Sequence, residues 1–141
     1  MAASAQDAHP WPIWAAGFID GEGCIRISHK VRVSVLQVDP RPLIQLQVLF
    51  GGSIRINRHS TGPKRRRIYV WEIGSRQART MLEQILPFLI VKKDQAELAL
   101  EHDKFGRAKR NSLNGAEGER RIAIRNKLKE LKWKEFEEIV V

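Results

Sequence analysis

The stretch that decides the fold is residues 13–23, which read IWAAGFIDGEG. At about 3.6 residues per helical turn, Ile13, Gly17 and Gly21 share one stripe of a helix. The two glycines carry no side chain, so a second backbone can approach this stripe closely. The pattern therefore predicts a helix that packs against another helix.

The remaining residues of this stretch predict how the helix is held and how it ends. Trp14 and Phe18 lie on the neighbouring stripe and can anchor the helix to the core of its own chain. Asp20 and Glu22 are two positions apart at the helix end, where the flanking glycines allow a sharp turn and the close approach of a ligand. Two carboxylates in that position suit a hard cation such as Mg²⁺, which takes oxygen ligands.

The composition favours one soluble domain with a polyanionic partner. The 141 residues contain 25 Lys and Arg against 16 Asp and Glu, a net charge of +9. Such an excess attracts polyanions, of which nucleic acid is the commonest. The single Cys24 excludes an internal disulfide and a cysteine-based zinc site. Because the sequence has no membrane-length apolar run and no secretory pattern, we expect an intracellular protein without a membrane partner, in a prokaryotic cytoplasm or an organelle.

Beyond the first helix, the pattern predicts two pairs of strands separated by a short helix. Apolar and polar residues alternate over 24–30 and 31–35, and again over 53–58 and 65–73. The short helix between them covers 43–50 and ends at two glycines. This order indicates an α+β fold with an antiparallel sheet.

The C-terminal part of the sequence predicts further helices. They cover 75–83, with Ser75 as N-cap, then 94–104 and 119–139. A polar, basic loop is expected over 106–118.

The alternation assigns one face of the sheet to the core and the other to a ligand. Residues expected in the core are Ile25, Ile27, Val31, Val33, Val35, Tyr69, Trp71 and Ile73. Residues expected on the opposite face, and predicted to bind DNA, are Arg26, Ser28, Lys30, Arg32, Ser34, Arg55, Asn57, Arg66, Ile68, Val70 and Glu72. A two-stranded ribbon fits the major groove, where Arg and Lys read guanine edges and apolar side chains meet thymine methyls.

Residues 15–23, AAGFIDGEG, resemble the signature of the LAGLIDADG homing endonuclease family, and the flanking sequence matches as well. The resemblance implies an αββαββα unit whose curved antiparallel sheet forms a saddle over DNA. One copy of the signature occurs, and a single-signature chain of this family acts as a homodimer with its signature helices on the two-fold axis. We therefore expect Ile13, Gly17, Asp20 and Gly21 at a dimer interface.

The resemblance covers residues 10–104, so we expect one endonuclease domain over residues 1–141, in which 105–141 form a C-terminal loop and helix. A two-fold dimer implies a long, pseudo-palindromic target in double-stranded DNA. Asp20 is expected to be a structural partner for backbone amides at the helix end.

The resemblance also implies catalytic roles. Glu22 corresponds to the family's metal ligand, with Gly21 beside it, and is a Glu where Asp is more usual. Mg²⁺ is the expected cofactor, and Ca²⁺ is expected to support binding without cleavage. Gln37 matches a residue near the nucleophilic water, Arg41 a basic residue around it, and Lys92 a lysine that approaches the scissile phosphate.

These observations predict a site-specific DNA endonuclease, associated with an intron or intein, that leaves short 3′ overhangs. Two alternatives share the fold: a cleavage-inactive RNA maturase and a DNA-binding regulator. A third is a ribosome-associated basic protein, which predicts RNA binding without sequence preference. Cleavage in Mg²⁺ separates the enzyme from all three.

Overall fold

The structure is a computed structural model that describes residues 10–57, 66–108 and 116–133. Helices and strands follow in the order α1 (Trp11–Glu22), β1 (Gly23–Ile27), β2 (Val31–Gln37), α2 (Arg41–Phe50), β3 (Ser53–Ile56), β4 (Tyr69–Gly74), α3 (Ser75–Ile85), η2 (Leu86–Phe88), α4 (Lys93–Ala108) and α5 (Ala116–Trp133). The α+β class and the predicted order of helices and strands are confirmed.

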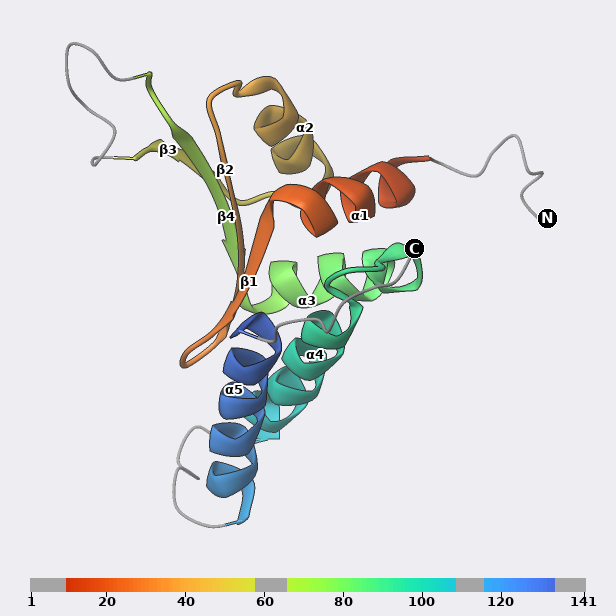
Figure 1. The fold of residues 1–141 in the computed structure, drawn as a ribbon, viewed down its shortest axis with the longest axis vertical. Helices are drawn as coiled ribbons and strands as arrows, with labels where there is room; N and C mark the ends of the chain where they lie inside the picture. The colour runs from red at the N-terminus through yellow and green to blue at the C-terminus, as the bar shows by residue number, and fades with distance from the viewer. Residues whose placement is uncertain (1–9, 58–65, 109–115, 134–141) are drawn as a thin grey trace, which may run out of the picture.

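The four strands form one antiparallel sheet in the order β1-β2-β4-β3. Helices α1, α2 and α3 cover one face of this sheet, and α4 and α5 lie side by side near the β1–β2 turn (Figure 1). We call the opposite face of the sheet, which carries Arg26, Arg32 and Glu72, the outer face.

The core lies between the sheet and these helices. Val33, Trp71 and Ile73 of the central strands are buried there with Ile19 of α1. The predicted inward faces of β1, β2 and β4 are confirmed, because Ile25 of β1 is buried and the register places Val33 opposite Ile73 and Val35 opposite Trp71.

Glycines fix two of the chain reversals that shape the unit. Gly51 and Gly52, after α2, have φ angles of 78° and 95°, in the region that favours glycine. The Trp71 indole N–H donates to the Gly51 carbonyl at 2.9 Å, so the core tryptophan also holds this turn. Gly23 joins α1 to β1, and a Cβ there would lie 2.9 Å from the Ile19 carbonyl oxygen. Only glycine lets the strand leave the helix so abruptly.

Some predicted boundaries were wrong. Gly74, not Ser75, is the N-cap of α3, and no side chain caps that helix. Ser75 instead turns the chain through its backbone, with a φ of 53°. Helix α4 continues to Ala108, and α5 begins at Ala116, so the helices extend into the predicted loop 106–118. The connection between the predicted strands 53–58 and 65–73 and the end of the last predicted helix, 134–139, lie outside the described residues.

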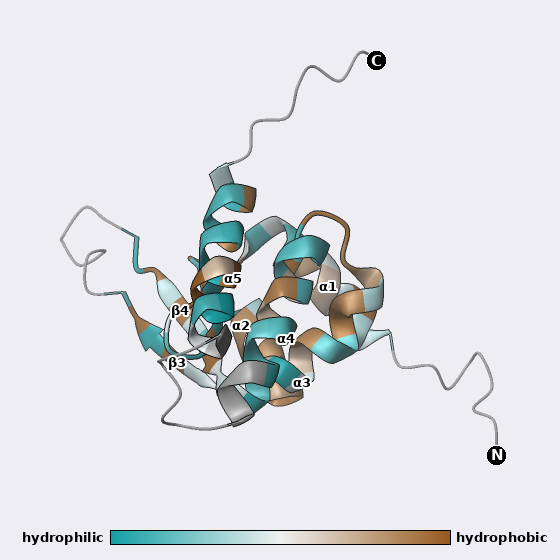
Figure 2. Ribbon diagram, turned by 90° about the horizontal axis from the view of Figure 1, so that it is seen from below, coloured by the Kyte–Doolittle hydropathy of each residue, from teal (hydrophilic) through white to brown (hydrophobic). Residues whose placement is uncertain are grey.

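The C-terminal helix is more than the charged, solvated helix its composition indicates. Ile124 and Leu128 are buried against the rest of the chain, and Figure 2 shows that the remainder of α5 is largely hydrophilic. None of the described helices has the length and apolarity needed to cross a membrane.

Candidate active site and nucleic-acid interface

The C-terminal end of α1 is tied to a segment far along the chain. The Asp20 carboxylate accepts hydrogen bonds from the backbone N–H groups of Ile90 and Lys92, at 2.8 and 2.9 Å. The Lys92 ammonium donates to the Asp20 carbonyl oxygen at 2.6 Å. Asp20 is thus a structural partner for backbone amides, as the sequence indicated, although these amides follow η2 rather than belong to its own helix end. The arrangement places Lys92 at the end of α1.

Glu22 is the last residue of α1 and is exposed. Gly23 next to it is already in β1, paired with Val35, so the carboxylate stands where the helix meets the sheet. Among the described residues, no group of three or more His, Cys, Asp or Glu side chains could hold a metal ion. In the part of the chain that the structure describes, Glu22 is thus not part of such a group, and a metal held there would need further ligands, such as a second copy and DNA phosphates.

The other two predicted catalytic residues, Gln37 and Arg41, lie at the end of β2 and at the start of α2. Gln37 ends β2 opposite Tyr69, and by alternation its side chain is on the helix side of the sheet rather than the outer face. Arg41 is the first residue of α2. Its Nε and Nη2 donate hydrogen bonds to the Asp39 carboxylate, the shortest at 2.6 Å between Nη2 and Oδ2. The Arg41 guanidinium lowers the pKa of Asp39 to about 2. Arg41 therefore carries its own counterion, although its side chain is 85% exposed.

The predicted dimer stripe of α1 is bare. Gly17 and Gly21 are exposed, and a Cβ at either position would have no atom within 4 Å. Ile13 on the same stripe is 58% exposed, and Ile90, whose N–H bonds to Asp20, is 86% exposed. In contrast, Ala15, Ala16 and Ile19 are fully buried. Trp14 and Phe18 are partly buried against the core, and their rings stack with centroids 5.4 Å apart. The exposed side of α1 is thus apolar and nearly free of side chains.

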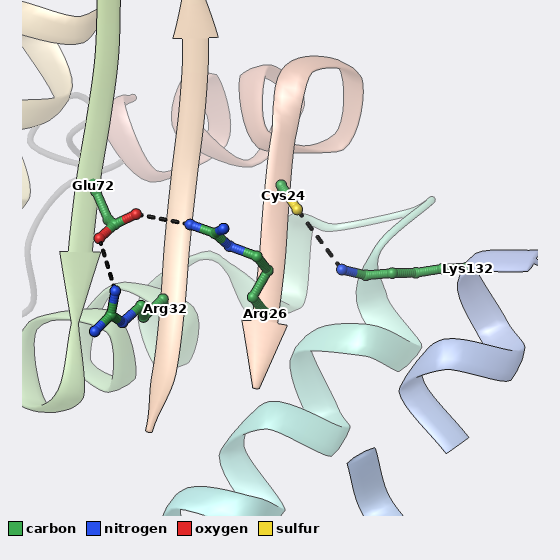
Figure 3. Close-up of polar contacts among 5 residues, drawn as sticks. All are labelled: Cys24, Arg26, Arg32, Glu72 and Lys132. Carbon is green, nitrogen blue, oxygen red and sulfur yellow. Dashed lines mark hydrogen bonds and ion pairs between the residues drawn. The ribbon is translucent and has the colours of Figure 1, made fainter. Parts of the chain in front are cut away.

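The outer face is organised around one carboxylate. Glu72 on β4 accepts hydrogen bonds from Arg26 at 2.8 Å and from Arg32 at 3.4 Å. Arg26 reaches Glu72 from β1 across β2 (Figure 3). A hollow of about 390 Å³ lies beside this cluster, lined in part by Lys30, Arg32, Ser53 and Glu72.

The other predicted DNA-binding residues differ in accessibility. Ser28, Arg55 and Arg66 are exposed, and Asn57 and Ile68 are half-buried. Ser34 and Val70 have the predicted outward register but are only 3% and 4% exposed. Both are small side chains on central strands, so their neighbours cover them. They offer little accessible surface in the single chain.

Basic residues of α5 lie next to the outer face. This placement was not predicted from the sequence. Lys132 donates to the backbone carbonyl of Ile25 on β1, and Arg121 donates to the carbonyl of His29 at 3.4 Å. Arg125 and Lys129 line a cleft with Arg26 and Arg32. The helical spacing could have indicated a basic face, because the cations at 125, 129 and 132 fall on one side of a helix.

No family profile matches the chain. In sequence, the chain is similar to the DNA endonuclease I-CvuI of Chlorella vulgaris, with 32% identity over 103 residues, which cover 62% of this chain and 60% of I-CvuI. The match thus spans less than two thirds of that relative's length.

Three solved complexes share the fold. Two contain I-CvuI, one with its target in the presence of Ca²⁺ and one with the I-CreI target in the presence of Mg²⁺, in which the DNA is not cleaved. Each has a TM-score of 0.70 and 23% identity, over 92% of this chain and 87% of that chain. The third is an archaeal intron-encoded homing endonuclease, I-Vdi141I, complexed with DNA, with a TM-score of 0.72, 18% identity and coverage of 92% and 89%.

The helix–strand order, the four-stranded sheet and these similarities agree with the signature at residues 15–23. The chain is thus similar in sequence to the DNA endonuclease I-CvuI and shares the fold of I-CvuI and I-Vdi141I, as the resemblance to the LAGLIDADG signature implies.

Proposed function

We propose that the chain is one subunit of a homodimeric, site-specific DNA endonuclease that hydrolyses phosphodiesters with a divalent metal. The observation that supports this most directly is the contact between the Lys92 ammonium and the Asp20 carbonyl, two positions before Glu22. It ties a cation to the same helix end that carries the proposed acidic ligand, where α1 joins β1. Phosphodiester hydrolysis needs both charges, because negative charge builds on the phosphate oxygens in the transition state.

The bare stripe of α1 supports a two-fold dimer. Two copies that meet through Gly17 and Gly21 would bring two α1 ends, and so two Glu22 carboxylates, to one place. Two strands of DNA present two scissile phosphates, so each needs its own acid and lysine. A symmetric dimer would read a pseudo-palindromic target.

Each residue has a defined part in the proposed reaction. Glu22, with the Gly21 carbonyl beside it, would hold Mg²⁺, which when bound stabilises charge on the attacking and leaving oxygens. Lys92 would stabilise the developing charge on the phosphate, and Gln37 would orient the attacking water. Arg41 would not contact the reacting atoms. It would contact a DNA phosphate if its ion pair with Asp39 opened. Cleavage across the minor groove would leave short 3′ overhangs.

The outer face would recognise the target. Its exposed arginines, Arg26, Arg55 and Arg66, have the donors that read guanine edges or contact phosphates. In the solved complexes, the related proteins I-CvuI and I-Vdi141I are bound to DNA. The proposed target is a long site, such as the uninterrupted form of a gene that carries an intron.

The test is cleavage of the host's intronless gene in Mg²⁺ and in Ca²⁺. Wild type should cut in Mg²⁺ and only bind in Ca²⁺. Glu22→Gln should bind equally well and lose cleavage by a factor on the order of 10² to 10³, the range for removal of one charge-stabilising group. Glu83→Gln, which neutralises an exposed carboxylate on α3, is the matched control and should cut like wild type.

Other outcomes identify the alternatives. Specific DNA binding without cleavage by wild type, whichever divalent metal is present, would favour the DNA-binding regulator. Preference for intron RNA over the DNA target would favour the maturase, and RNA binding without sequence preference would favour the ribosome-associated protein.

A further inference from the structure

Helix α5 is fixed beside the free edge of β1. Its apolar side packs through Ile124 and Leu128, and Lys132 reaches the backbone of β1 at Ile25. The same ammonium lies 3.7 Å from the Cys24 sulfur, and Figure 3 shows the lysine extended towards that strand. These contacts hold the helix at the border of the outer face, so its basic side cannot turn freely away from the sheet.

A cleft of about 280 Å³ lies between α5 and the β1–β2 hairpin. The residues that line it are Arg26, Ile27, Ser28, Arg32, Arg125, Leu128, Lys129 and Lys132. Five of these are cations, and none of the described residues that line the cleft is a carboxylate.

The positive charge in the cleft is only partly compensated. Arg26 and Arg32 share the single carboxylate of Glu72. Within the described residues, neither Arg125 nor Lys129 is paired with a carboxylate. The Nε of Arg32 is buried and has no hydrogen-bond partner there. Like charges held close together repel, and buried donors are normally satisfied, so the cleft lacks an anion that its residues could bind.

The position and size of the cleft indicate which anion this is. A volume of about 280 Å³ is just below the usual range for ligand pockets and leaves room for a phosphate group, whose charge matches the cationic lining. The cleft lies beyond β1, at the edge of the face that the proposed function assigns to DNA. A duplex that follows the outer face would carry its sugar-phosphate backbone over this edge.

We infer that the α5 cleft binds a backbone phosphate of the duplex that flanks the base pairs read by the sheet. This inference rests on the proposed function. The helix then adds a sequence-independent anchor, with Arg125 and Lys129 as its main ligands and Lys132 as the residue that positions the helix. Phosphate contacts of this kind fix position and register rather than sequence.

The test measures affinity in Ca²⁺ for two duplexes, one trimmed to the central base pairs and one extended at both ends, over a range of salt concentrations. Lys129→Gln should weaken binding to the extended duplex several-fold and reduce the slope of log affinity against log salt by about one per phosphate lost. Arg125→Gln should do the same. Neither variant should change affinity for the trimmed duplex, and both should lower affinity for target and non-target extended sequences alike.

Lys127→Gln is the matched control. Lys127 is an exposed lysine on α5 that is turned about half a revolution from Arg125 and Lys129, away from the cleft. Equal losses in Lys127→Gln and Lys129→Gln would overturn the inference, because a general charge effect would then explain both. Equal losses on the trimmed and extended duplexes would overturn it too. The proposed function fails separately, if wild type does not bind or cut the target at all.

Discussion

The end of α1 and the outer face of the sheet both carry charged groups, but they hold them in different ways. At the end of α1, the charges of Asp20 and Lys92 are bound to backbone atoms, at 2.6 to 2.9 Å. On the outer face, Arg26 and Arg32 are held only by the Glu72 side chain, and the Arg26 side chain is 51% exposed. Backbone partners fix a position, whereas exposed side-chain pairs contribute little stability and exchange easily with a ligand. The comparison suggests that the chain holds its proposed catalytic lysine, Lys92, rigidly and its proposed DNA-reading arginines loosely.

The largest effect is expected from a substitution that leaves the end of α1 intact in each chain but prevents a second copy from packing against α1. Gly17→Leu adds a side chain where no atom lies within 4 Å of a Cβ, so the chain should fold as well as wild type, or slightly better because leucine favours helices. Sedimentation velocity should show loss of the dimer, and cleavage should fall by a factor of at least about 100.

Ala123→Leu is the control for added bulk, because Ala123 is exposed on α5, away from the stripe. It should leave the dimer and cleavage intact. A dimer that survives Gly17→Leu would show that the bare stripe is not the interface.

Asp20→Asn tests the rigid end itself. The amide keeps one oxygen to accept a hydrogen bond, but its NH₂ group cannot accept the second one that the carboxylate receives. The free energy of unfolding should fall by about 1 kcal/mol, the usual cost of one such hydrogen bond. Cleavage should fall as well, since the segment that carries Lys92 is no longer held. Urea unfolding measures the first effect and single-turnover cleavage the second.

Asp94→Asn, an exposed carboxylate in the first turn of α4, is the control for the charge. If it reduces cleavage as much as Asp20→Asn, the loss is one of charge and not of positioning.

Glu72→Gln tests the loosely held face. The Glu72 side chain is only 22% exposed, but its partners Arg26 and Arg32 are 51% and 43% exposed. Thermal stability should therefore fall only slightly, because ion pairs open to solvent contribute at most about 1 kcal/mol. Arg26 and Arg32 would lose their counterion, so affinity for non-target DNA should rise roughly fivefold at low salt, equivalent to about 1 kcal/mol. Discrimination between target and competitor duplexes should fall. An unchanged discrimination ratio would show that Glu72 does not organise recognition.

The smallest expected effect concerns the junction of α4 and α5. His102 is 2% exposed, and its Nε2 has no hydrogen-bond partner among the described residues. Burial lowers the pKa of His102, and so do Arg121 and Arg125 on α5, whereas Asp103 opposes them. The unfolded chain therefore binds a proton more readily than the folded one, so stability present above about pH 6.5 is lost as the pH falls.

The melting temperature should accordingly be lower at about pH 5.5 than at about pH 7.5. His102→Gln should reduce this difference, and His29→Gln, at the exposed β1–β2 turn, should not. A pH dependence that is the same in both variants would contradict the assignment to His102.

Short-range patterns predicted much of this molecule. Alternation left two parities open for the last strand, and the favoured one, with Trp71 and Ile73 in the core and Glu72 on the outer face, is confirmed. The glycine spacing on α1 likewise predicted the bare stripe at Gly17 and Gly21, since helical period alone decides which residues share a face.

What the sequence could not provide were contacts made over long separations. Lys92 and Asp20 are 72 positions apart, and their hydrogen bonds depend on how η2 brings the chain back to α1. The docking of α5 on β1 depends on packing between α4 and α5, which no local pattern records. The start of α3 at Ser75 was predicted, but its N-cap was placed one residue too late, because Ser75 has a positive φ that no residue preference would predict for serine.

The most direct test of the account is the mass of protein bound to one target duplex in Ca²⁺, measured by sedimentation equilibrium. The account predicts two chains of 16.2 kDa on each duplex, and a single chain when Gly17 is replaced by Leu. One wild-type chain per duplex at saturation would contradict it, because a single Glu22 and a single Lys92 could not then act on both strands.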